Sequence, residues 1–200
     1  YSAVSWRKAA ENDGDTFIAF ASAADAGKAS FLTPQAETLL NRTEQAMPQF
    51  TKAHYKPGDR IGVSMYKTGP GFDIIWTDLE TTSTAEGTGW GIFARTGDPK
   101  PYAVLANPSH DGNSIVYVST NTGNSAGTIS SNGELRVIPY GARKGGTSTE
   151  LAGANDPASK QFYPSYSPDD KFVAFDRAPA GYTSYNDPKA ELYVIPSTGG

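Results

Sequence analysis

An internal repeat constrains the fold of this chain more strongly than any other feature of its sequence. Residues 109–117 read SHDGNSIVY and residues 167–175 read SPDDKFVAF. Further along, residues 134–139 read ELRVIP and residues 191–196 read ELYVIP. In each copy a turn rich in Asp and Gly leads into a short apolar strand, and a polar loop follows before a second strand that ends at Pro. Such self-similarity is the signature of a fold built from repeated supersecondary units.

Two weaker copies of the unit lie upstream. Residues 14–20 (GDTFIAF) match residues 169–175, and SFLTP at 30–34 occupies the place of the second strand. A further copy, one residue shorter in its turn, covers residues 55–63 and has DIIWTDL at 73–79 as its second strand. The copies align on Trp6, Tyr55, Pro108 and Tyr166. Their spacing of about 50 residues is typical of a four-stranded propeller blade.

The strands of the repeat have the composition of middle strands in stacked sheets. Ile115–Val118 and Phe172–Phe175 are short runs rich in β-branched and aromatic residues. A sheet that is covered on both sides should be apolar on both faces rather than strictly alternating. We therefore expect each sheet to pack between two neighbours. Asp111-Gly112 and Asn132-Gly133 are expected to form hairpin-type turns.

One segment departs from the all-β pattern. Residues 34–47 (PQAETLLNRTEQAM) place Leu39, Leu40 and Met47 near one face of a helix, so we interpret them as a short helix or ordered insert. The rest of the chain predicts an all-β fold of four-stranded antiparallel blades within a single domain. The expected domain is 1–200, and its approximate blades are 1–47, 48–100, 101–158 and 159–200.

The repeat resembles that of a known family. The pattern Ser-Pro-Asp-Asp-Lys-Phe-Val-Ala-Phe, followed by Glu-Leu-Tyr-Val-Ile-Pro, is similar to the WD-repeat-like β-propeller repeat of TolB-type proteins. The chain departs from the family pattern where Asp170 replaces Gly, where His110 replaces Pro, and in a shortened turn after Pro57. Because all three lie in turns, we expect solvent-facing changes that cost the fold little.

The resemblance implies an architecture and two contexts. Propellers of this kind have six to eight blades, so about four blades ending in a connecting turn at residues 197–200 predict that the chain is part of a longer protein. The repeat is similar to that of periplasmic envelope proteins that bind other proteins. It is also similar to that of the non-catalytic propeller in prolyl-oligopeptidase-like peptidases. Fold alone does not decide between these contexts.

Charge and composition exclude several classes of partner. The net charge is −4 and no basic stripe is present, which argues against a nucleic-acid partner or an anionic membrane surface. The longest apolar run, residues 17–24, is far shorter than the roughly 20 residues that span a bilayer. Cysteine is absent, so disulfides, thiolate nucleophiles and Cys-based zinc sites are excluded.

The sequence contains no recognisable catalytic constellation. No Gly-x-Ser-x-Gly string is present. The two histidines, His54 and His110, both align with the turn region of the repeat, which favours turn residues over a triad or a zinc site. Glu134 and Glu191 recur at one repeat position, and we expect their carboxylates to accept nearby backbone N–H groups rather than to act in catalysis. We therefore expect a non-enzymatic chain without a cofactor.

Calcium is the one metal that the composition leaves open. Asn12-Asp13-Gly14-Asp15 resembles part of a calcium loop but lacks the distal Glu, and the repeat explains it as a hairpin turn. The segment Tyr185-Asn186-Asp187-Pro188 is similarly interpreted as a loop tip before Glu191. A structural calcium ion remains an alternative, and no metal site is assigned.

Exposed aromatic residues are the best candidates for binding. Trp76 and Tyr163 are expected to pack between blades, whereas Tyr182 and Tyr185 lie in the polar loop GYTSYNDP. Tyr side chains in such loops anchor ligands well. The loops at 119–133 and 176–190 occupy equivalent places and are expected to emerge side by side. The predicted binding surface consists of Tyr182, Tyr185, Asn186 and Asp187.

Three functional hypotheses follow. The first is a non-catalytic module that binds a protein partner, with a periplasmic or secreted location implied by the TolB-type resemblance alone. The second is the propeller of a prolyl-oligopeptidase-like serine peptidase whose catalytic domain is not in this chain. The third is a carbohydrate-binding propeller, which glycan-dependent thermal stabilisation would reveal.

Overall fold

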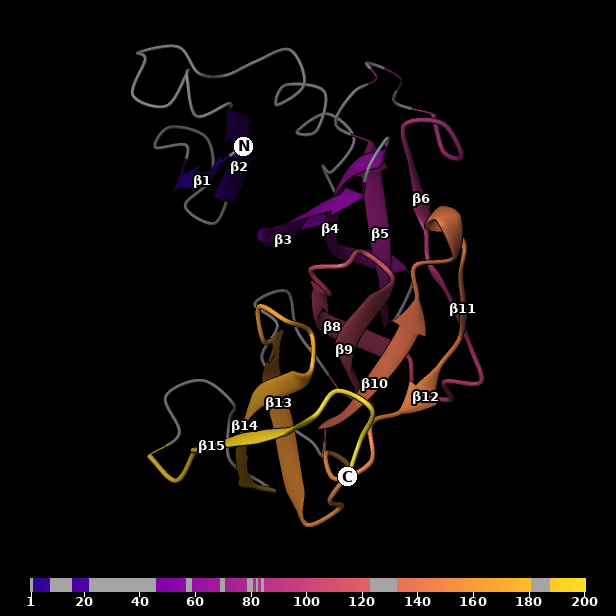
Figure 1. Cartoon of the computed structure of the whole chain (residues 1–200). Helices are drawn as coiled ribbons and strands as arrows, with labels where there is room; N and C mark the ends of the chain where they lie inside the picture. Colours follow the sequence, from indigo (N-terminus) through magenta and orange to yellow (C-terminus); the bar gives the residue numbers. More distant parts are fainter. Residues whose placement is uncertain are drawn as a thin grey trace.

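The fold is almost entirely β in the computed structural model. The model describes residues 2–7, 16–21, 46–56, 59–68, 71–78, 81, 83, 85–122, 133–180 and 188–200. Within these ranges the regular structure consists of strands and one short 3-10 turn, η1 (Gly141–Arg143). The first two strands pair antiparallel: β1 (Ser2–Arg7) and β2 (Thr16–Ala21). Figure 1 shows the strands in sequence colours.

Two antiparallel meanders follow along the chain. The first contains β3 (Ala46–Lys56), β4 (Asp59–Thr68), β5 (Gly71–Asp78) and β6 (Trp90–Ile92). The second contains β8 (Tyr102–Pro108), β9 (Ser114–Thr120), β10 (Gly133–Pro139) and β12 (Thr149–Glu150). Alongside them, two short strands pair in parallel: β7 (Ala94–Thr96) and β11 (Gly145–Thr147).

The two meanders are joined rather than separate, which differs from the expected isolated blades. A single parallel pair, Phe72 with Tyr102, links β5 to β8, so the strands form one eight-stranded sheet. The close approach requires Gly71, because a Cβ at this position would lie 2.1 Å from the carbonyl oxygen of Pro101. The last sheet contains β13 (Ser159–Tyr166), β14 (Phe172–Pro179) and β15 (Glu191–Pro196).

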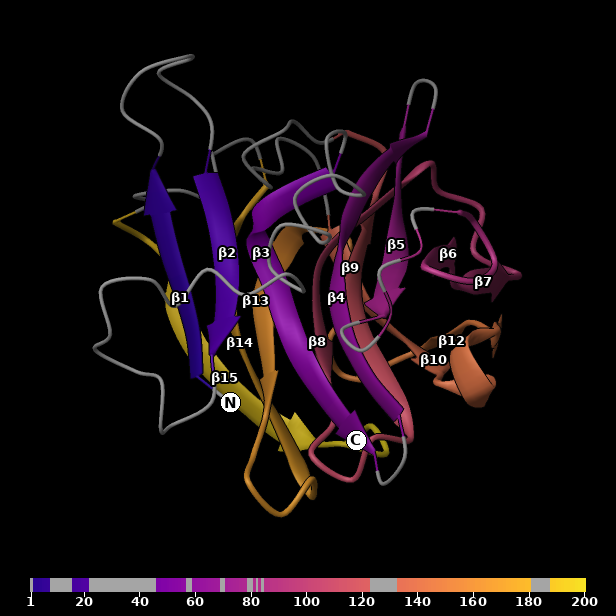
Figure 2. The same ribbon diagram turned by 90° about the horizontal axis from the view of Figure 1, so that it is seen from above.

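The sheets stack face to face through two apolar layers, as the both-sided apolar strands predicted. On β9, Ile115 and Tyr117 face the first meander, where they pack near Ile74 and Trp76. The alternate residues of β9 face the last sheet and join a second cluster. That cluster includes Val116, Val118, Leu135, Phe162, Val173 and Phe175. The first strands of the two meanders and of the last sheet, β3, β8 and β13, lie next to one another (Figure 2).

A bulge recurs at one position of the repeat. The register of β8 shifts between Val104 and Asn107, and that of β13 shifts between Phe162 and Ser165. Inside these bulges Leu105 and Tyr163 have φ angles of 56° and 52°, a left-handed conformation that non-glycine residues rarely adopt. The same irregularity in two equivalent strands shows that the repeat extends to backbone geometry. Tyr163 is 37% exposed and not packed between sheets as expected, whereas Trp76 and the equivalent bulge residue Leu105 are buried.

The turn after each bulged strand has the same hydrogen bonds in both copies. In the first copy Ser109 Oγ donates to Asp111 and accepts from the backbone N–H of Ser114. In the second copy Ser167 Oγ donates to Asp169 and accepts from the N–H of Phe172. The matching bonds explain why Ser and Asp recur at these positions of the sequence.

The two turns also contact each other, and this overturns one expectation. The carboxylate of Asp170 accepts hydrogen bonds from the backbone N–H groups of His110 (2.8 Å) and Asp111 (2.7 Å), and it lies 3.0 Å from Nδ1 of His110. The side chain of Asp170 is only 18% exposed. Proline at 110 would lack the N–H and glycine at 170 would lack the carboxylate. The two departures from the family repeat therefore form one contact between adjacent sheets and are not independent solvent-facing changes.

Two further expectations concern the first hundred residues. Residues 34–45 of the expected helix lie outside the described residues, and its last two residues, Ala46 and Met47, belong to β3. His54 was expected in a turn but lies within β3, where it is paired with Ile61 of β4. The aligned residue Ser165 also lies within its strand, β13, so this repeat position belongs to the strand before the turn. His110 does lie in its predicted turn.

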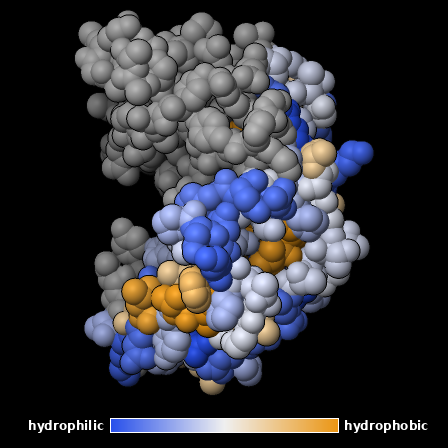
Figure 3. Space-filling model, viewed as in Figure 1, coloured by the Kyte–Doolittle hydropathy of each residue, from blue (hydrophilic) through white to orange (hydrophobic). Residues whose placement is uncertain are grey.

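The outer face of the last sheet is apolar and uncovered. Leu192 and Val194 of β15 are 71% and 60% exposed, and Phe172 of β14 is 45% exposed. The pairing of Phe172 with Pro196 and of Ala174 with Val194 places these side chains on one face. Figure 3 shows the corresponding orange patch over β15. We refer to Phe172, Leu192 and Val194 as the outer apolar face.

Candidate functional site

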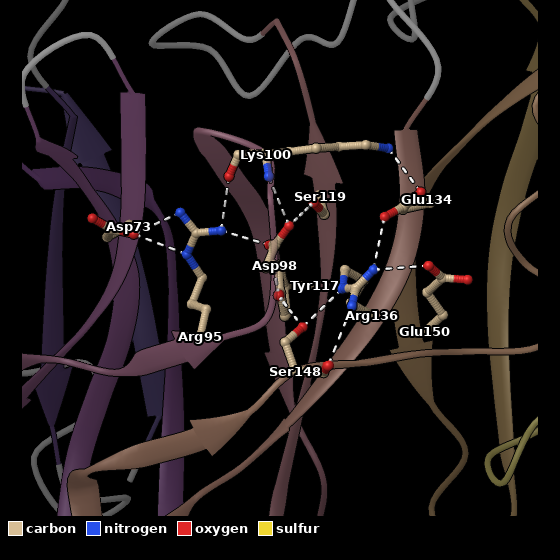
Figure 4. Close-up of polar contacts among 10 residues, drawn as sticks. All are labelled: Asp73, Arg95, Asp98, Lys100, Tyr117, Ser119, Glu134, Arg136, Ser148 and Glu150. Atoms are coloured by element: carbon tan, nitrogen blue, oxygen red, sulfur yellow. Dashed lines mark hydrogen bonds and ion pairs between the residues drawn. The ribbon is translucent and has the colours of Figure 1, made fainter.

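A network of charged side chains lies between the two meanders (Figure 4). At its centre is Asp98, whose side chain is fully buried. Its carboxylate accepts hydrogen bonds from Ser119 Oγ (2.7 Å) and Tyr117 OH (2.8 Å), and from the backbone N–H of Lys100 (3.1 Å). Arg95 forms ion pairs with both Asp98 and Asp73. The buried carboxylate is thus surrounded by donors.

These donors determine the protonation of the network. Burial acts to raise the pKa of Asp98, but the hydrogen bonds from Ser119, the backbone of Lys100 and Tyr117, together with the Arg95 cation, outweigh burial and lower the pKa. Burial is also the main cause of a strongly raised pKa for Tyr117. Asp98 therefore remains a carboxylate and Tyr117 a neutral phenol at neutral pH.

The other half of the network surrounds Arg136 on β10. Its Nε donates to Ser148 Oγ (2.8 Å), and its Nη1 lies 3.0 Å from Glu134 and 3.1 Å from Glu150. Glu134 also pairs with Lys100 at 2.8 Å. The partners of Glu134 are the side-chain cations of Arg136 and Lys100. The prediction that its carboxylate accepts backbone N–H groups is therefore wrong. Every carboxylate of the network touches a cation, which indicates a structural contact between strands.

The last sheet keeps two acidic residues of this network at the equivalent positions but replaces its other members. Aligning the turns of the two copies places Asp156 at the position of Asp98, and aligning the second strands places Glu191 at the position of Glu134. The remaining equivalences are Phe175 for Tyr117, Arg177 for Ser119, Gly153 for Arg95 and Tyr193 for Arg136. Loss of the Arg95 and Arg136 side chains means that the network cannot close in the same way here.

A cavity of about 500 Å³ is present at this equivalent position. It lies between the start of β13, the end of β14 and the start of β15. Its lining includes Asp156, Arg177, Pro179, Pro188, Glu191 and Tyr193. We call it the Arg177 cavity. The repeat position that is filled by paired charges in one sheet is therefore open in the next.

Arg177 is the central cation of the cavity. Its guanidinium lies 4.2 Å from the ring centre of Tyr193 and 5.7 Å from that of Phe175. Its Nη2 donates to the carbonyl oxygen of Gly153 (2.8 Å). Its Nε is buried and has no hydrogen-bond partner among the residues that the structure describes. A buried N–H of a charged group without an acceptor is costly, so this guanidinium is short of an acceptor.

The acidic residues of the cavity already have partners. Asp156 accepts from the backbone N–H of Ala158 (2.9 Å) and from Ser159 Oγ (2.8 Å). These two hydrogen bonds, in that order, lower the pKa of Asp156 below its ordinary value. Glu191 accepts from Tyr193 OH at 2.9 Å. Both carboxylates therefore accept hydrogen bonds from groups in or next to the same sheet.

The predicted binding residues can only be placed by their neighbours. Tyr182, Tyr185, Asn186 and Asp187 lie outside the described residues. Pro179 and Pro188, which flank this segment, both line the Arg177 cavity. The sequence analysis missed Arg177, although one signal was available. At this repeat position a small neutral Ser in one copy is replaced by Arg in the next.

Metal binding has no support from the part of the chain that is described. Those residues contain no group of three or more His, Asp or Glu side chains placed to hold a metal ion. The calcium-like segment at 12–15 lies outside the described residues. The segment at 185–188 is also outside them except for Pro188. A structural calcium ion at either segment stays an alternative to the predicted turns.

Comparison with known proteins identifies the fold. No protein-family model and no curated protein matches this chain. The solved structure of TolB from Agrobacterium tumefaciens matches with a TM-score of 0.51 and 15% identity, covering 75% of this chain and 47% of that one. The chain has a TolB-like propeller fold. It spans about half the length of the Agrobacterium protein.

Two further solved structures are similar at lower scores. TolB from Acinetobacter baumannii has a TM-score of 0.46 and 14% identity, covering 75% of this chain and 30% of that one. A prolyl endopeptidase structure has a TM-score of 0.40 and 15% identity, covering 80% of this chain and 22% of that one.

Among the described residues, no helix combines the length and apolar character that crossing a membrane requires.

Proposed function

We propose that the chain is a non-catalytic binding module of a TolB-like propeller protein, located in the cell envelope or secreted. The observation that carries the proposal is the Arg177 cavity, which opens at the base of the predicted binding loop. Loops held by a rigid scaffold are where binding residues concentrate. The stacked sheets supply such a scaffold, because two buried apolar layers tie three successive sheets together.

The proposed partner is a protein. The loop between Pro179 and Pro188 carries Tyr182 and Tyr185, and Tyr is enriched at the centres of protein interfaces. The net charge of −4 disfavours nucleic acid as an alternative partner. The proposal of an envelope or secreted location rests on the likeness to TolB.

We further propose that the module is part of a propeller of six to eight blades. The outer apolar face supports this, because the equivalent of Leu192 in the preceding repeat, Leu135, is fully buried by the next sheet. The coverage of 47% of the Agrobacterium TolB chain is consistent with additional blades in the parent protein. In that protein another blade would cover Leu192 and Val194.

Site-specific photocrosslinking tests the binding function. A photoreactive phenylalanine analogue replaces Tyr182 or Tyr185, and a control chain carries it at Lys171, an exposed residue at the opposite end of β14. The chains are irradiated with periplasmic or secreted proteins of the source organism. We expect one discrete protein adduct from positions 182 and 185, abolished by excess unmodified chain, and no such adduct from position 171.

The same experiment defines the contrary result. Equal labelling of many proteins from all three positions, or no adduct from positions 182 and 185, would contradict a binding surface on this loop. Fractionation of the parent protein between cytoplasm and envelope tests the proposed location separately. Recovery in the cytoplasm alone would exclude that location without affecting the binding result.

A further inference from the structure

We propose that Arg177 binds a carboxylate group of a partner protein within the Arg177 cavity. This inference rests on the proposed binding function and assigns it a ligand chemistry. A guanidinium is a planar fork of donors whose geometry matches a carboxylate. The Nε of Arg177 is itself buried, so a carboxylate in the cavity would meet the Nη groups of the fork, of which Nη2 donates to the carbonyl oxygen of Gly153.

The guanidinium is held in place before any ligand arrives. Tyr193 lies under its face at 4.2 Å, and the carbonyl of Gly153 accepts from Nη2. These contacts limit the rotation of a side chain that is otherwise flexible, so less conformational entropy is lost on binding. The preceding sheet has a comparable arrangement inside the protein, where Arg95 faces the buried carboxylate of Asp98. A ligand carboxylate would thus form a contact that the fold already uses.

The other lining groups favour a carboxylate over other ligands. Asp156 and Glu191 contribute two negative charges to the cavity, and Arg177 and Lys189 contribute two positive charges. The lining therefore has no net positive charge to hold a phosphate dianion and suits a carboxylate with a single charge better. A sugar would need an open aromatic face to stack on, but the ring of Tyr193 is covered by Arg177. The two prolines of the lining, Pro179 and Pro188, offer apolar contacts to a peptide. A peptide carboxylate fits all three observations.

Two sources of the carboxylate are distinguished by matched peptides. The first pair is acetyl-Ala-Ala-Pro-Ala with a free carboxyl terminus and the same peptide as its amide. The second pair is acetyl-Ala-Asp-Ala amide and its Asn counterpart. Binding to the 200-residue chain and to its variants is measured by isothermal titration calorimetry, and in the unmodified chain it is also followed by the NMR signal of the Arg177 Nε–H group. We expect one charged peptide to shift this signal and its neutral partner to leave it unchanged.

Variants assign the binding to Arg177. Arg177→Gln should abolish binding of the charged peptide, and Arg177→Lys, which keeps the charge but loses the fork, should weaken it by roughly tenfold. Lys171→Gln removes one exposed cation from the opposite end of β14 and should leave the affinity unchanged. Thermal unfolding of each variant confirms that the chain is folded. Because Arg177→Lys retains length and charge, it remains informative if Arg177→Gln does not fold.

Each contrary outcome has a clear meaning. Equal binding of the charged and neutral peptides, unchanged affinity in Arg177→Lys, or tighter binding of inorganic phosphate than of either carboxylate would overturn the inference. So would failure of both charged peptides to bind. In those cases a crosslinked adduct from positions 182 and 185 that persists in Arg177→Gln would leave the proposed binding function standing. If neither peptide binding nor the crosslinked adduct is observed, the proposed binding function is wrong as well.

Discussion

Strands β10 and β15 carry nearly the same six residues but lie in different surroundings. Residues 134–139 read ELRVIP and residues 191–196 read ELYVIP. Leu135 of β10 is completely buried, whereas its equivalent, Leu192 of β15, is 71% exposed. Each strand runs antiparallel to the strand before it, and the additional pairing of β10 with β12 lies in the plane of the sheet and covers neither face. Local sequence and local pairing therefore do not account for the difference.

The neighbouring sheet accounts for it. Leu135 lies in the apolar layer formed with Phe162, Val173 and Phe175 of the last sheet. No described sheet lies over Leu192. In a fold of stacked sheets, burial of a side chain is thus decided by the next repeat rather than by its own. The comparison shows which contacts are supplied within this chain and which would have to come from outside it.

The largest expected effect is on stability at the two leucines. Leu135→Ala creates a cavity in a closed layer and should lower the free energy of unfolding by about 2–5 kcal/mol. Leu192→Ala removes an exposed side chain and should change it by less than about 0.5 kcal/mol. Urea unfolding of the two variants measures both values. Equal losses would show that Leu192 is covered in solution, and the comparison would then fail.

A smaller effect is expected at the contact between the two turns. Asp170→Gly restores the family residue and relieves a left-handed φ of 56°. It also removes the carboxylate that accepts from His110 and Asp111. The two hydrogen bonds to the charged carboxylate contribute more free energy than the strain of about 1 kcal/mol that glycine relieves. We therefore expect the free energy of unfolding to fall by about 1–2 kcal/mol. An increase in stability in urea unfolding would show that the contact contributes nothing.

Replacing the equivalent serines of the two turns should lower the free energy of unfolding by modestly different amounts. Ser109→Ala and Ser167→Ala remove the same pair of hydrogen bonds, but Ser109 is buried and Ser167 is partly exposed. We expect a loss of about 1 kcal/mol for Ser109→Ala and about half of that for Ser167→Ala, because water replaces the lost bonds more readily at Ser167. Thermal unfolding under identical conditions measures the difference. A larger loss at Ser167 would contradict the burial argument.

The smallest expected difference is in the response to acid. The pKa of Asp98 is lowered in the folded chain, so its stabilising contribution is present above the unfolded pKa of about 4 and is lost as the pH falls through the folded value. Asp98→Asn should flatten the fall in stability below pH 4 more than Asp156→Asn, because Asp156 is partly exposed whereas the side chain of Asp98 is fully buried. Unfolding midpoints between pH 7 and pH 2.5 provide the measurement. Identical slopes would place the acid-sensitive group elsewhere.

Much of the fold was predictable because the repeat is expressed in local residue patterns. The turn residues Ser109 and Asp111 recur as Ser167 and Asp169 and form the same hydrogen bonds in both copies. The both-sided apolar strands correctly predicted stacked sheets. The parallel pair between Phe72 and Tyr102 was not predictable, because a single bridge between meanders has no sequence signature.

The candidate site was predicted less well than the fold. The loop containing Tyr182 and Tyr185 remains a prediction, and the cavity beside it was not anticipated. Arg177 is separated from Asp156 by a strand and a turn in the sequence, and from Tyr193 by a whole loop. Only pairing of β14 with β13 and β15 brings these residues together. The replacement of Ser by Arg between the two repeats could have indicated a role for Arg177. The sequence could not have predicted how Arg177, Asp156 and Tyr193 are arranged in space.

By itself the sequence determined the repeating unit: its turns, its strands and their apolar character on both faces. These features depend on backbone conformation and hydrophobicity, which neighbouring residues specify locally. The tertiary structure alone decided which equivalent positions are buried, that Asp170 bonds to the turn of the preceding sheet, and that the position of Asp98 opens into a cavity at Asp156. These outcomes depend on which side chains from distant repeats meet, and one strand carries no information about the strand packed against it.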